Sequence, residues 1–517
     1  MSAPEQRMRL AELMAALSLA TDLGMGQPME KAMRGCLLAL ELARRLNADA
    51  DTLHDVYYLA LLQHIGCTSH AYEWAGYAGG DEIAMRTHAV TFANSPMSEV
   101  MNAFVHHAGR GLPLPKRAAL VAAMVRNGSR RFAFVSATQC EAAVCLAQRI
   151  EMPAGVLSGL AHGLETWNGR GGPKRLRGEE LNFAARILAV AHDAEVFERV
   201  GGLDACTTAV RKRRGAAYDP AVADAFLAAG HDIFQAVPPG PLWDAVLAAE
   251  PQPHVLISEM GLDGVACAFA DFIDLKLPFT SGHSRGVAAL AGSAAALMGL
   301  DSHDASALHR AALMHDIGRI AIANGIWEKP GPLSTPEWER VRLHAYHGER
   351  ILSRTPALVD ICALVSLHHE RQDGSGYHRG STAAQLSGSA RLLAAADAYQ
   401  AMTQERPHRP AMAPDEAARQ LRAEAGAGRL ERSVVECVLE AAGHARARVR
   451  ADLPAGLSER EVQVLRELCL GRTNRQTADR LHIAERTVGH HVQHIYNKIG
   501  RSTRAGAALF AMEHGLV

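Results

Sequence analysis

Apolar residues recur at helical spacing along most of this chain. A representative stretch contains Leu37, Leu38, Leu40, Leu42, Ala43 and Leu46. A repeat of three to four residues is typical of amphipathic helices that bury one face. The pattern predicts an all-α protein built from helical bundles.

Two breaks in this pattern divide the chain. The first, between Val237 and Pro253, is rich in proline, which disfavours helix interiors. The second runs from Ala451 to Gly456. With 517 residues, 48% of them hydrophobic, the chain can bury two or three cores. We therefore expect domains at 1–237, 257–450 and 453–517.

Charge and cysteine content narrow the class of protein. Lys and Arg number 54 against 55 Asp and Glu, so bulk charge does not favour a polyanion partner. The nine cysteines are scattered and never spaced C-x-x-C, which argues against a disulfide framework or a thiolate zinc site. Without a signal-like N-terminal pattern or an apolar run of about 20 residues, we expect a cytoplasmic protein.

The first two domains resemble a worn internal duplication. Residues 61–66 (Leu-Leu-Gln-His-Ile-Gly) align with residues 313–318 (Leu-Met-His-Asp-Ile-Gly), an offset of 252. Residues 185–189 align with 390–394 at a smaller offset, so the alignment needs gaps. Chance similarity between Ala/Leu-rich helices is the alternative; a true repeat predicts two copies of one helical domain.

Histidine is concentrated in the second domain, where imidazoles and carboxylates form a candidate metal site. The candidate ligands are His283, His315, Asp316, His344, His368, His369 and Asp397. This donor set without thiolates suits Fe, Mn or Zn, and it exceeds the needs of one tetrahedral ion. An adjacent His-Asp pair in an apolar helix needs a partner, because burying a lone carboxylate is costly. Two ions bridged by an aspartate could polarise a phosphate.

Residues 280–415 resemble the HD-GYP subgroup of HD-domain phosphohydrolases. The matching segments are His315–Gly318, Lys329–Leu333, His368–Arg371, Asp373–Tyr377 and Arg406–Pro407. The resemblance implies a helical bundle that hydrolyses cyclic di-GMP with divalent metal ions, Fe or Mn. It also implies that His283, His315, Asp316 and Asp397 hold one ion, that His344, His368 and His369 hold the other, and that Asp316 bridges them.

The same resemblance assigns catalytic roles to Asp316 and Arg319, and substrate binding to Arg319, Gly376, Tyr377 and Arg406. Arg319 replaces the usual lysine, and its guanidinium can still fork onto a phosphate. His378 replaces the proline of the Gly-Tyr-Pro motif, and Gln400 replaces an acidic residue. Phe279 stands where three-metal members place a glutamate, so we expect two ions.

The first copy lacks these ligands. Lys31 aligns with His283, and Gln63-His64 aligns with His315-Asp316. The double-histidine region reads Ala161-His162-Gly163. His192-Asp193 imitates an HD pair near the position of Asp397, and we attribute it to chance. We expect this copy to bind no dinuclear centre and to pack, dimerise or bind a signal.

The C-terminal segment 457–517 is locally basic, with nine Lys or Arg against six Asp or Glu. Ser458 is placed to cap a first helix, Gly471 to end it, and Thr473 to open a second. Thr487 begins a third helix with Val488, Val492, Ile495 and Ile499 inward. This arrangement suits a helix that enters a DNA major groove.

This segment closely resembles the LuxR-type helix-turn-helix. The matching residues include Leu457–Ser458, Arg460–Glu461, Thr487–Val488, His491–Val492 and Lys498–Ile499. The resemblance implies DNA contacts from Asn474, Arg486, Thr487, His490, Gln493, Asn497, Lys498 and Arg504. Lys498 and Arg504 would hold phosphates, and the last helix, about Thr503 to His514, would mediate a homodimer.

Together these features predict a transcriptional regulator that joins a metal-dependent cyclic di-GMP phosphodiesterase to a LuxR-type DNA-binding domain. One alternative is a catalytically silent nucleotide sensor, which Arg319 and His378 favour. Another is a phosphohydrolase that acts on a different nucleotide.

Overall fold

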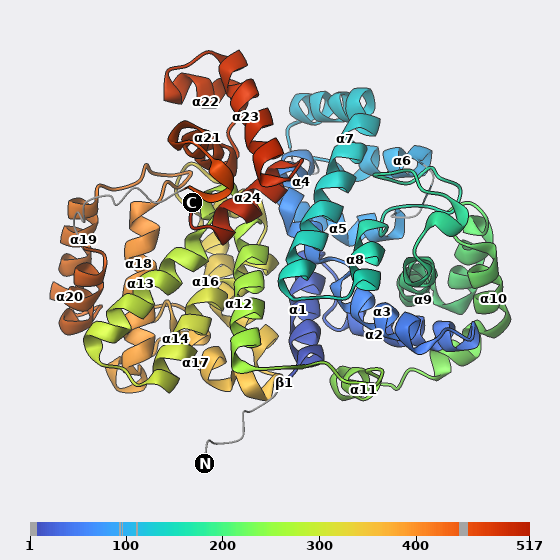
Figure 1. Cartoon of the computed structure of the whole chain (residues 1–517), viewed down its shortest axis with the longest axis horizontal. Helices are drawn as coiled ribbons and strands as arrows, with labels where there is room; N and C mark the ends of the chain where they lie inside the picture. Colours follow the sequence, from blue (N-terminus) through green and yellow to red (C-terminus); the bar gives the residue numbers. More distant parts are fainter. Residues whose placement is uncertain (1–7, 93–94, 96, 110–111, 444–452) are drawn as a thin grey trace. The chain divides into compact units, whose positions relative to one another are not determined.

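The computed structural model describes residues 8–92, 95, 97–109, 112–443 and 453–517. It divides into two compact units, Met1–Val265 and Ala266–Val517 (Figure 1). The described residues are almost entirely helical, and their only strands are the short pair β1 (Met8–Arg9) and β2 (Leu256–Ile257). The predicted all-α class is therefore confirmed. The predicted limit at residue 450 lies outside the described residues, and the three-domain division stays a prediction.

The first unit is a bundle of helices with three short 3-10 turns in its described part. Its elements after β1 are α1 (Leu10–Gly24), α2 (Lys31–Arg45), α3 (Ala50–Leu62), η1 (Ile65–His70), α4 (Ala71–Ala78), α5 (Glu82–Ala89), η2 (Val90–Phe92), α6 (Met97–His107), α7 (Leu114–Arg149), α8 (Ala154–Ala161), η3 (Gly178–Glu180), α9 (Phe183–Arg213), α10 (Pro220–Gln235) and α11 (Trp243–Ala248). Helix α12 (Glu259–Asp274) follows β2 and runs into the second unit.

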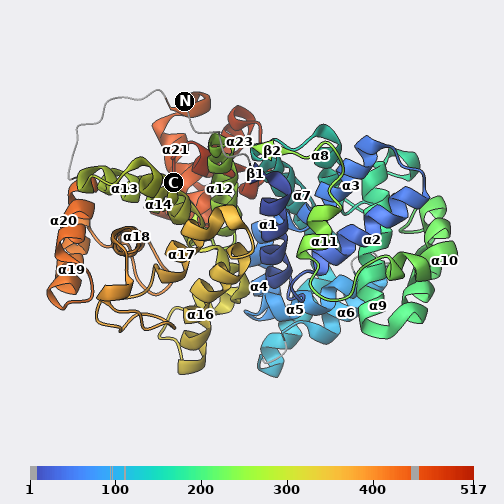
Figure 2. The same ribbon diagram turned by 90° about the horizontal axis from the view of Figure 1, so that it is seen from below.

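The second unit begins with a larger bundle in which α13 packs on α14, α18 and α20 (Figures 1 and 2). Its elements are η4 (Pro278–Thr280), α13 (His283–Met298), α14 (Ser302–Met314), η5 (Ile317–Ala321), α15 (Asn324–Trp327), α16 (Thr335–Leu352), η6 (Pro356–Leu358), α17 (Val359–Leu367), η7 (Ala383–Gln385), α18 (Gly388–Thr403), α19 (Pro414–Gly426) and α20 (Arg432–Ala441).

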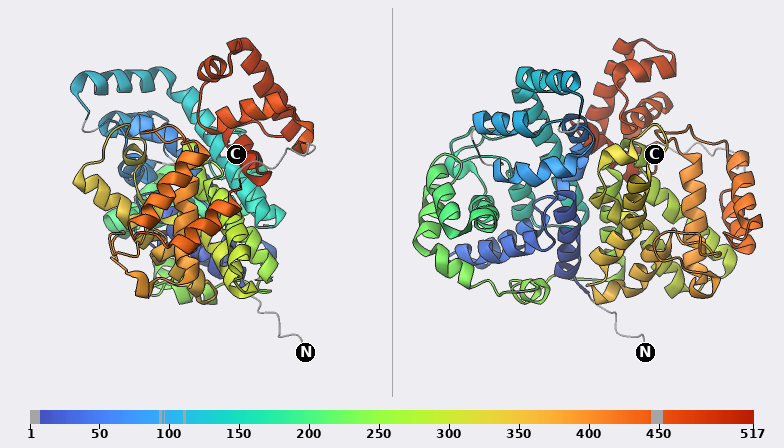
Figure 3. Two further views of the ribbon diagram at one scale, coloured as in Figure 1. Left: turned by 90° about the vertical axis from the view of Figure 1, so that its left-hand side faces the viewer. Right: turned by 180° about the vertical axis from the view of Figure 1, so that it is seen from behind.

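The last helices form a small group with its own core (Figure 3). They are η8 (Pro454–Gly456), α21 (Glu459–Cys469), α22 (Asn474–Leu481), α23 (Glu485–Ile499) and α24 (Arg504–Glu513). Ser458 caps α21 in a reciprocal capping box with Glu461, and Thr473 caps α22 in the same way with Gln476. The predicted inward residues Val488, Ile495 and Ile499 are buried, as the helical spacing requires.

The two segments that the sequence aligns at an offset of 252 open with the same local structure. Asp22 accepts the backbone N–H of Ala32, and Asp274 accepts that of Ser284. Burial raises the pKa of both carboxyls to about 7. In addition, Asp49 caps α3 as Asp301 caps α14.

Later in the chain the offset falls to 205. Glu165 accepts the backbone N–H groups of Lys174 and Arg175, and Glu370 accepts those of Arg379 and Ser381. Each copy thus preserves the same buried carboxylate under the same loop, which supports a true duplication. Within the described part of the chain, no helix combines the length and apolar character needed to cross a membrane.

Gly318 brings η5 against α16 at a distance that excludes a side chain. A Cβ atom on Gly318 would lie 1.9 Å from the carbonyl oxygen of His344 and 2.5 Å from the backbone nitrogen of Gly348. Both atoms belong to the backbone and cannot rotate away. The glycine after the His-Asp pair therefore fixes the spacing between the two segments that carry His315 and His344.

We expect Gly318→Ala to lower the stability of the second unit by about 3 kcal/mol, because overpacking against backbone forces η5 and α16 apart. Gly292→Ala on α13 is the matched control, since a Cβ there meets no atom within 4 Å and alanine favours the helix. Thermal unfolding checks both. A Gly318→Ala protein as stable as the wild type would contradict the close approach.

Candidate metal centre and DNA-binding surface

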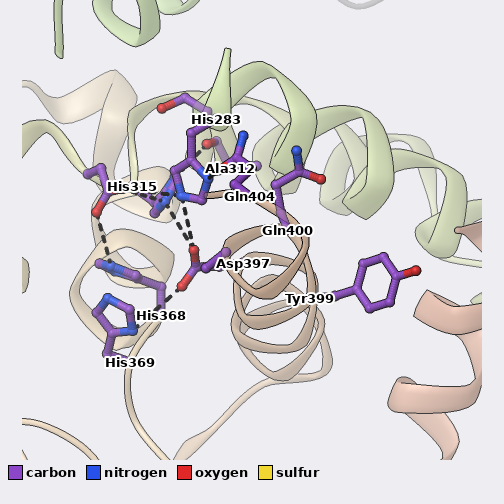
Figure 4. A network of polar contacts seen from close by, with 12 residues as sticks. His283, Ala312, His315, His368, His369, Asp397, Tyr399, Gln400 and Gln404 are labelled. Atoms are coloured by element: carbon purple, nitrogen blue, oxygen red, sulfur yellow. Dashed lines mark hydrogen bonds and ion pairs between the residues drawn. The ribbon is translucent and has the colours of Figure 1, made fainter. Parts of the chain in front are cut away.

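The seven candidate ligands come from five helices and meet in the interior of the second unit. His283 is the first residue of α13, His315 and Asp316 follow α14, and His344 lies on α16. His368 and His369 follow α17, and Asp397 lies on α18. Figure 4 shows several of these side chains pointing toward one another, whereas Tyr399 on α18 points away. The sequence therefore identified residues that the fold brings together.

One ring nitrogen of each of four histidines is held by an oxygen outside the cluster. Nδ1 of His315, His344 and His368 donates to the carbonyl oxygen three residues earlier, at 2.7, 2.6 and 2.6 Å. Nδ1 of His283 donates to the side-chain Oε1 of Gln404 at 2.9 Å. These bonds fix the tautomer and aim each Nε2 into the site, as is usual for metal-ligating histidines.

The two carboxylate oxygens of Asp316 face different groups of imidazoles. Oδ2 lies 3.0 Å from His315 Nε2 and 3.5 Å from His283 Nε2. Oδ1 lies 3.4 Å from His344 Nε2 and 3.8 Å from His368 Nε2. Asp397 Oδ1 completes the first group at 3.2 Å from His283 Nε2. Asp316 is thus positioned to share one oxygen with each of two ions.

The donor atoms form two groups in which all ligand atoms lie within 4.8 Å of one another. One group is His283, His315 and Asp397; the other is Asp316, His344, His368 and His369. In the described structure, buried Nε2 of His283 and His315, Oδ1 of Asp316 and Oδ1 of Asp397 lack a hydrogen-bond partner. Unpaired buried polar atoms are costly, and a divalent ion in each group would satisfy them.

The contact between His344 and His368 also indicates that this cluster suits a metal ion. Their Nε2 atoms lie 3.1 Å apart, and each ring already donates its Nδ1 proton to a carbonyl. Two neutral rings therefore direct lone pairs at each other, which is unfavourable unless a cation lies between them. The residues present suit divalent ions of the kind that imidazole and carboxylate prefer.

Burial lowers the pKa of four of the five imidazoles, those of His283, His344, His368 and His369, and so favours the neutral form that binds metals. It lowers the pKa of His283 and His344 to about 4 and that of His368 to about 3. Burial alone would also lower the pKa of His315, but the carboxylates of Asp316 and Asp397 raise it to about 9.

Two guanidinium groups supply positive charge beside this centre. Arg319 Nη1 lies 2.9 Å from Asp316 Oδ2, and its guanidinium packs over the ring of Trp327. Arg406 Nη2 donates to the Gln404 Oε1 that also accepts from His283, and burial together with the nearby charge of Arg319 lowers the pKa of Arg406 to about 10. Both of the predicted phosphate-binding arginines therefore lie at the metal site.

Gly376 and Tyr377 lie at the edge of the candidate metal site. A Cβ on Gly376 would lie 2.5 Å from the Cα of Glu370, so only glycine lets this loop cross the segment that carries His369. The Tyr377 ring lies 4.3 Å from the ring of His369, centroid to centroid. His378, which stands at the proline position of the motif, is exposed and lies beside Tyr346.

The predicted reading face of α23 is open to solvent. Its exposed members are Arg486, Thr487, His490, Gln493 and Asn497, and they follow helical spacing on the side opposite the buried Val488 and Ile495. Gln493 Nε2 donates to Asn497 Oδ1 at 3.1 Å. Asn474, the first residue of α22, is half-buried beside Gly489.

The two predicted phosphate contacts have partners within the protein. Lys498 Nζ lies 2.7 Å from Glu461 Oε2 and donates to the carbonyl of Gly456. Arg504 donates to the carbonyl oxygen of Arg472 at 2.9 Å. Both cations therefore hold the bundle together in addition to any role at DNA.

Comparison with known families matches both parts of the chain in which these residues lie. The HD domain family matches residues 134–222 and 268–434, and the luxR family of bacterial regulatory proteins matches residues 455–511. The chain is an HD-domain protein with a LuxR-family domain. HD-domain proteins of this type are metal-dependent phosphohydrolases, and this chain belongs to that class.

Individual relatives of the HD domains are cyclic dinucleotide phosphodiesterases. The chain is 29% identical to a 3′3′-cGAMP-specific phosphodiesterase 3 of Vibrio cholerae, over 81% of this chain and 91% of that protein. It is 37% identical to a cyclic di-GMP phosphodiesterase of Thermotoga maritima, over 28% of this chain and 40% of that protein. A crystal structure of a cyclic GMP-AMP-specific phosphodiesterase of Vibrio cholerae has the same fold, with a TM-score of 0.58 and 24% identity over 85% of this chain and 99% of that one.

The first HD copy has replaced the metal ligands position by position. At the offset of 205, Gly163 and Leu164 stand opposite His368 and His369, so the region Ala161–Gly163 aligned from the sequence lies slightly too early in the chain. His192 stands opposite Asp397. A cavity of about 90 Å³ lies at these positions, lined in part by Gln63, His64, Gly163, Leu164 and His192.

Two buried groups occupy this region of the first copy. The side chain of Lys31 is buried near the carboxylates of Glu195 and Asp193, and burial lowers its pKa. His192 Nδ1 lies 3.0 Å from Asp193 Oδ1, and Asp193 also pairs with Arg213 and Tyr218, so its carboxylate is held by protein groups. Among the described residues, the groups of three or more potential ligands occur only in the second HD copy.

Gln404 is the functional residue that the sequence did not reveal. It holds His283 from a loop more than a hundred residues away, and glutamine carries no metal-ligand signal of its own. Glu370 belonged to a recognised motif, but its role in holding the Arg379–Ser381 backbone required the structure.

Acidification is expected to destabilise the metal-free protein. His283, His344 and His368 have folded pKa values near 4, 4 and 3, against 6.5 for an ordinary histidine. Between pH 6.5 and about 4 the unfolded chain therefore binds more protons than the folded chain, and stability falls as pH falls. The raised pKa of His315 acts oppositely, and its contribution is lost as pH rises from 6.5 to about 9.

Thermal unfolding of chelator-treated protein across this range measures the effect. His344→Asn should reduce the loss of stability on acidification, because it removes one imidazole that must stay neutral. His303→Asn, at an exposed position on α14, should leave the pH profile unchanged. An identical profile for wild type and His344→Asn would show that His344 is not held neutral.

Proposed function

We propose that this protein hydrolyses a phosphodiester bond of a cyclic dinucleotide with two divalent ions, Fe or Mn, and regulates transcription through its LuxR-family domain. The observation that carries the enzymatic part is the placement of Asp316, whose two oxygens face two separate groups of imidazoles. The names of the relatives support a cyclic dinucleotide such as cyclic di-GMP or 3′3′-cGAMP.

We assign one ion to His283, His315, Asp316 and Asp397, and the other to His344, His368, His369 and Asp316. Such paired ions polarise a phosphate and lower the pKa of a water molecule. The protein's own cations, Arg319 and Arg406, would bind and orient the phosphate oxygens. Gly376 would position the loop, and Tyr377 would close the side of the pocket next to His369.

The regulatory part rests on the exposed face of α23. Arg486, Thr487, His490, Gln493 and Asn497 present donors and acceptors of the kind that read base edges in a major groove. Asn474, Lys498 and Arg504 would contact the backbone and fix register. We propose a homodimer, so that two DNA-binding domains read two half-sites. The predicted dimer helix α24 is buried within the chain from Ala505 to Met512, so that helix offers no open face for a partner and the dimer contact must lie elsewhere. DNA and cyclic dinucleotides are both cytoplasmic, and we place the protein there.

One contact favours the alternative of a catalytically silent nucleotide sensor. Arg319 forms an ion pair with Oδ2 of Asp316, the oxygen that the first ion would share. A cation from the protein at this point could reduce occupancy of that ion while leaving phosphate binding intact. Nucleotide binding without turnover by metal-loaded protein would select this alternative.

We expect His344→Asn to lower hydrolysis of cyclic di-GMP or 3′3′-cGAMP by at least about 100-fold, because replacing second-shell partners alone costs 10- to 100-fold. Bound metal per chain should fall in parallel. Protein purified anaerobically with Fe or Mn should be assayed for linear dinucleotide and mononucleotide. His303→Asn is the matched control, since this histidine is exposed on the same bundle. Metal-free, inactive wild-type protein would overturn the enzymatic proposal.

For the DNA-binding part, Arg486→Ala is expected to cost about 1–3 kcal/mol of discrimination between promoter fragments and unrelated DNA. Arg486 is exposed on the reading face. Arg419→Ala on α19 removes an equal charge from an exposed position elsewhere. Lys498→Ala is less informative, because it also breaks the ion pair with Glu461. Equal effects of the two arginine variants in a salt titration would contradict base reading by α23.

A further inference from the structure

Within the second unit, the LuxR-family domain packs against the loops that hold the metal centre. Glu405 forms an ion pair with Arg472, and Arg480 lies 3.7 Å from the same carboxylate. Ser281 Oγ donates to the carbonyl oxygen of Cys469 at 3.2 Å. Leu275 packs against the core of the LuxR-family domain. Polar and apolar contacts thus join the two domains.

The LuxR-family domain and the HD domain approach each other so closely at Gly282 and Gly471 that neither position has room for a Cβ atom. A Cβ on Gly282 would lie 2.5 Å from the carbonyl oxygen of Val517, and one on Gly471 would lie 2.9 Å from Pro278. Gly282 immediately precedes His283, so one side of this contact is continuous with a candidate metal ligand.

The other side of the contact is a three-residue segment, Gln404–Arg406, that reaches the active site at both of its ends. Gln404 accepts from His283 Nδ1 at 2.9 Å and from Arg406 Nη2 at 3.3 Å. Arg406 packs over Phe279 and lies in the field of Arg319 and Asp397. Glu405 lies between these two residues and forms the ion pair with Arg472 of the LuxR-family domain. Neither end can shift far without moving Glu405.

We propose that Glu405 occupies Arg472 and Arg480 in competition with DNA phosphates, and that a nucleotide at the metal centre relieves this competition through Arg406. The inference rests on the proposed function and specifies how its two activities are joined. Arg472 lies two residues before α22 and Arg480 lies in the last turn of that helix. Both arginines therefore belong to the helix-turn-helix itself. A phosphate that engages Arg406 draws the Gln404–Arg406 segment toward the metal centre and away from Arg472.

The coupling is reciprocal because both ligands bias one equilibrium. Nucleotide binding favours release of Arg472 and Arg480, and DNA that takes up these arginines frees Arg406 for phosphate. Glu467 also pairs with both arginines, so they remain ordered when Glu405 departs.

Glu405→Gln in the full chain tests the competition directly. We expect it to bind a short fluorescent DNA duplex about 5-fold more tightly than wild type or better, within the usual range of coupling between sites. The slope of log affinity against log salt should steepen by roughly two, because two more cations meet phosphates. An arbitrary duplex suffices, since phosphate contacts are independent of sequence.

Two further arms separate this effect from general changes in charge. Glu424→Gln removes a carboxylate of α19 that pairs with Arg429 and forms none of the contacts described above, and it should bind DNA like wild type. In an Arg472→Gln background, Glu405→Gln should still free Arg480 but should tighten DNA binding less than it does in the wild-type background. A hydrolysis-resistant phosphorothioate analogue of cyclic di-GMP should tighten DNA binding by wild type and add little for Glu405→Gln.

The outcomes distinguish this inference from the proposed function. If wild type binds DNA and Glu405→Gln binds no more tightly, or responds equally to the nucleotide analogue, the coupling through Glu405 is wrong. If no variant binds DNA at low salt, the proposed DNA-binding function fails as well. Hydrolysis by Glu405→Gln reports on the enzyme separately, because Glu405 contacts none of the candidate metal ligands.

Discussion

The structure of the second HD domain depends on the charge balance around one buried carboxylate. Asp316 is fully buried, and among the described residues its nearest neighbours are four imidazoles and one guanidinium. Burying such a charge is costly unless cations approach it. Within the protein, Arg319 and His315, whose pKa is raised to about 9, supply positive charge, whereas the other three imidazoles are neutral. His283 begins α13, His315 follows α14, His344 lies on α16, His368 follows α17 and Arg319 lies on η5. The way the helices of the bundle pack therefore also determines which groups surround the charge of Asp316.

Much of this centre could be predicted from the sequence, because the types of its residues and their order along the chain indicate the candidate ligands. Histidines and aspartates are unusual in apolar helices, so their positions identified the ligands before their distances were known. The reading face of α23 followed from helical spacing in the same way. By contrast, Gln404 acts across 121 positions in the chain, and Lys498 is tied to Glu461 by the packing of α21 on α23. Such contacts depend on how helices meet, which local pattern does not specify.

The first HD copy shows that this bundle does not require a metal centre in order to form. Its loops keep the buried carboxylates Asp22 and Glu165 that organise backbone in the second copy. At the centre itself, a buried lysine, Lys31, stands in place of His283, and small or apolar residues replace other imidazoles. The same bundle therefore accommodates a centre with imidazole ligands in one copy and a centre without them in the other.

The anchors of the histidines differ in kind, and this difference has a consequence for how the site can diverge. Backbone carbonyls orient His315, His344 and His368, so substitutions of neighbouring side chains leave these three rings in place. His283 alone among the four is oriented by a side chain, that of Gln404. Evolution can therefore reshape the pocket walls freely on one side of the centre. On the other side, a single substitution at position 404 would retune the affinity for one ion and leave its neighbour untouched.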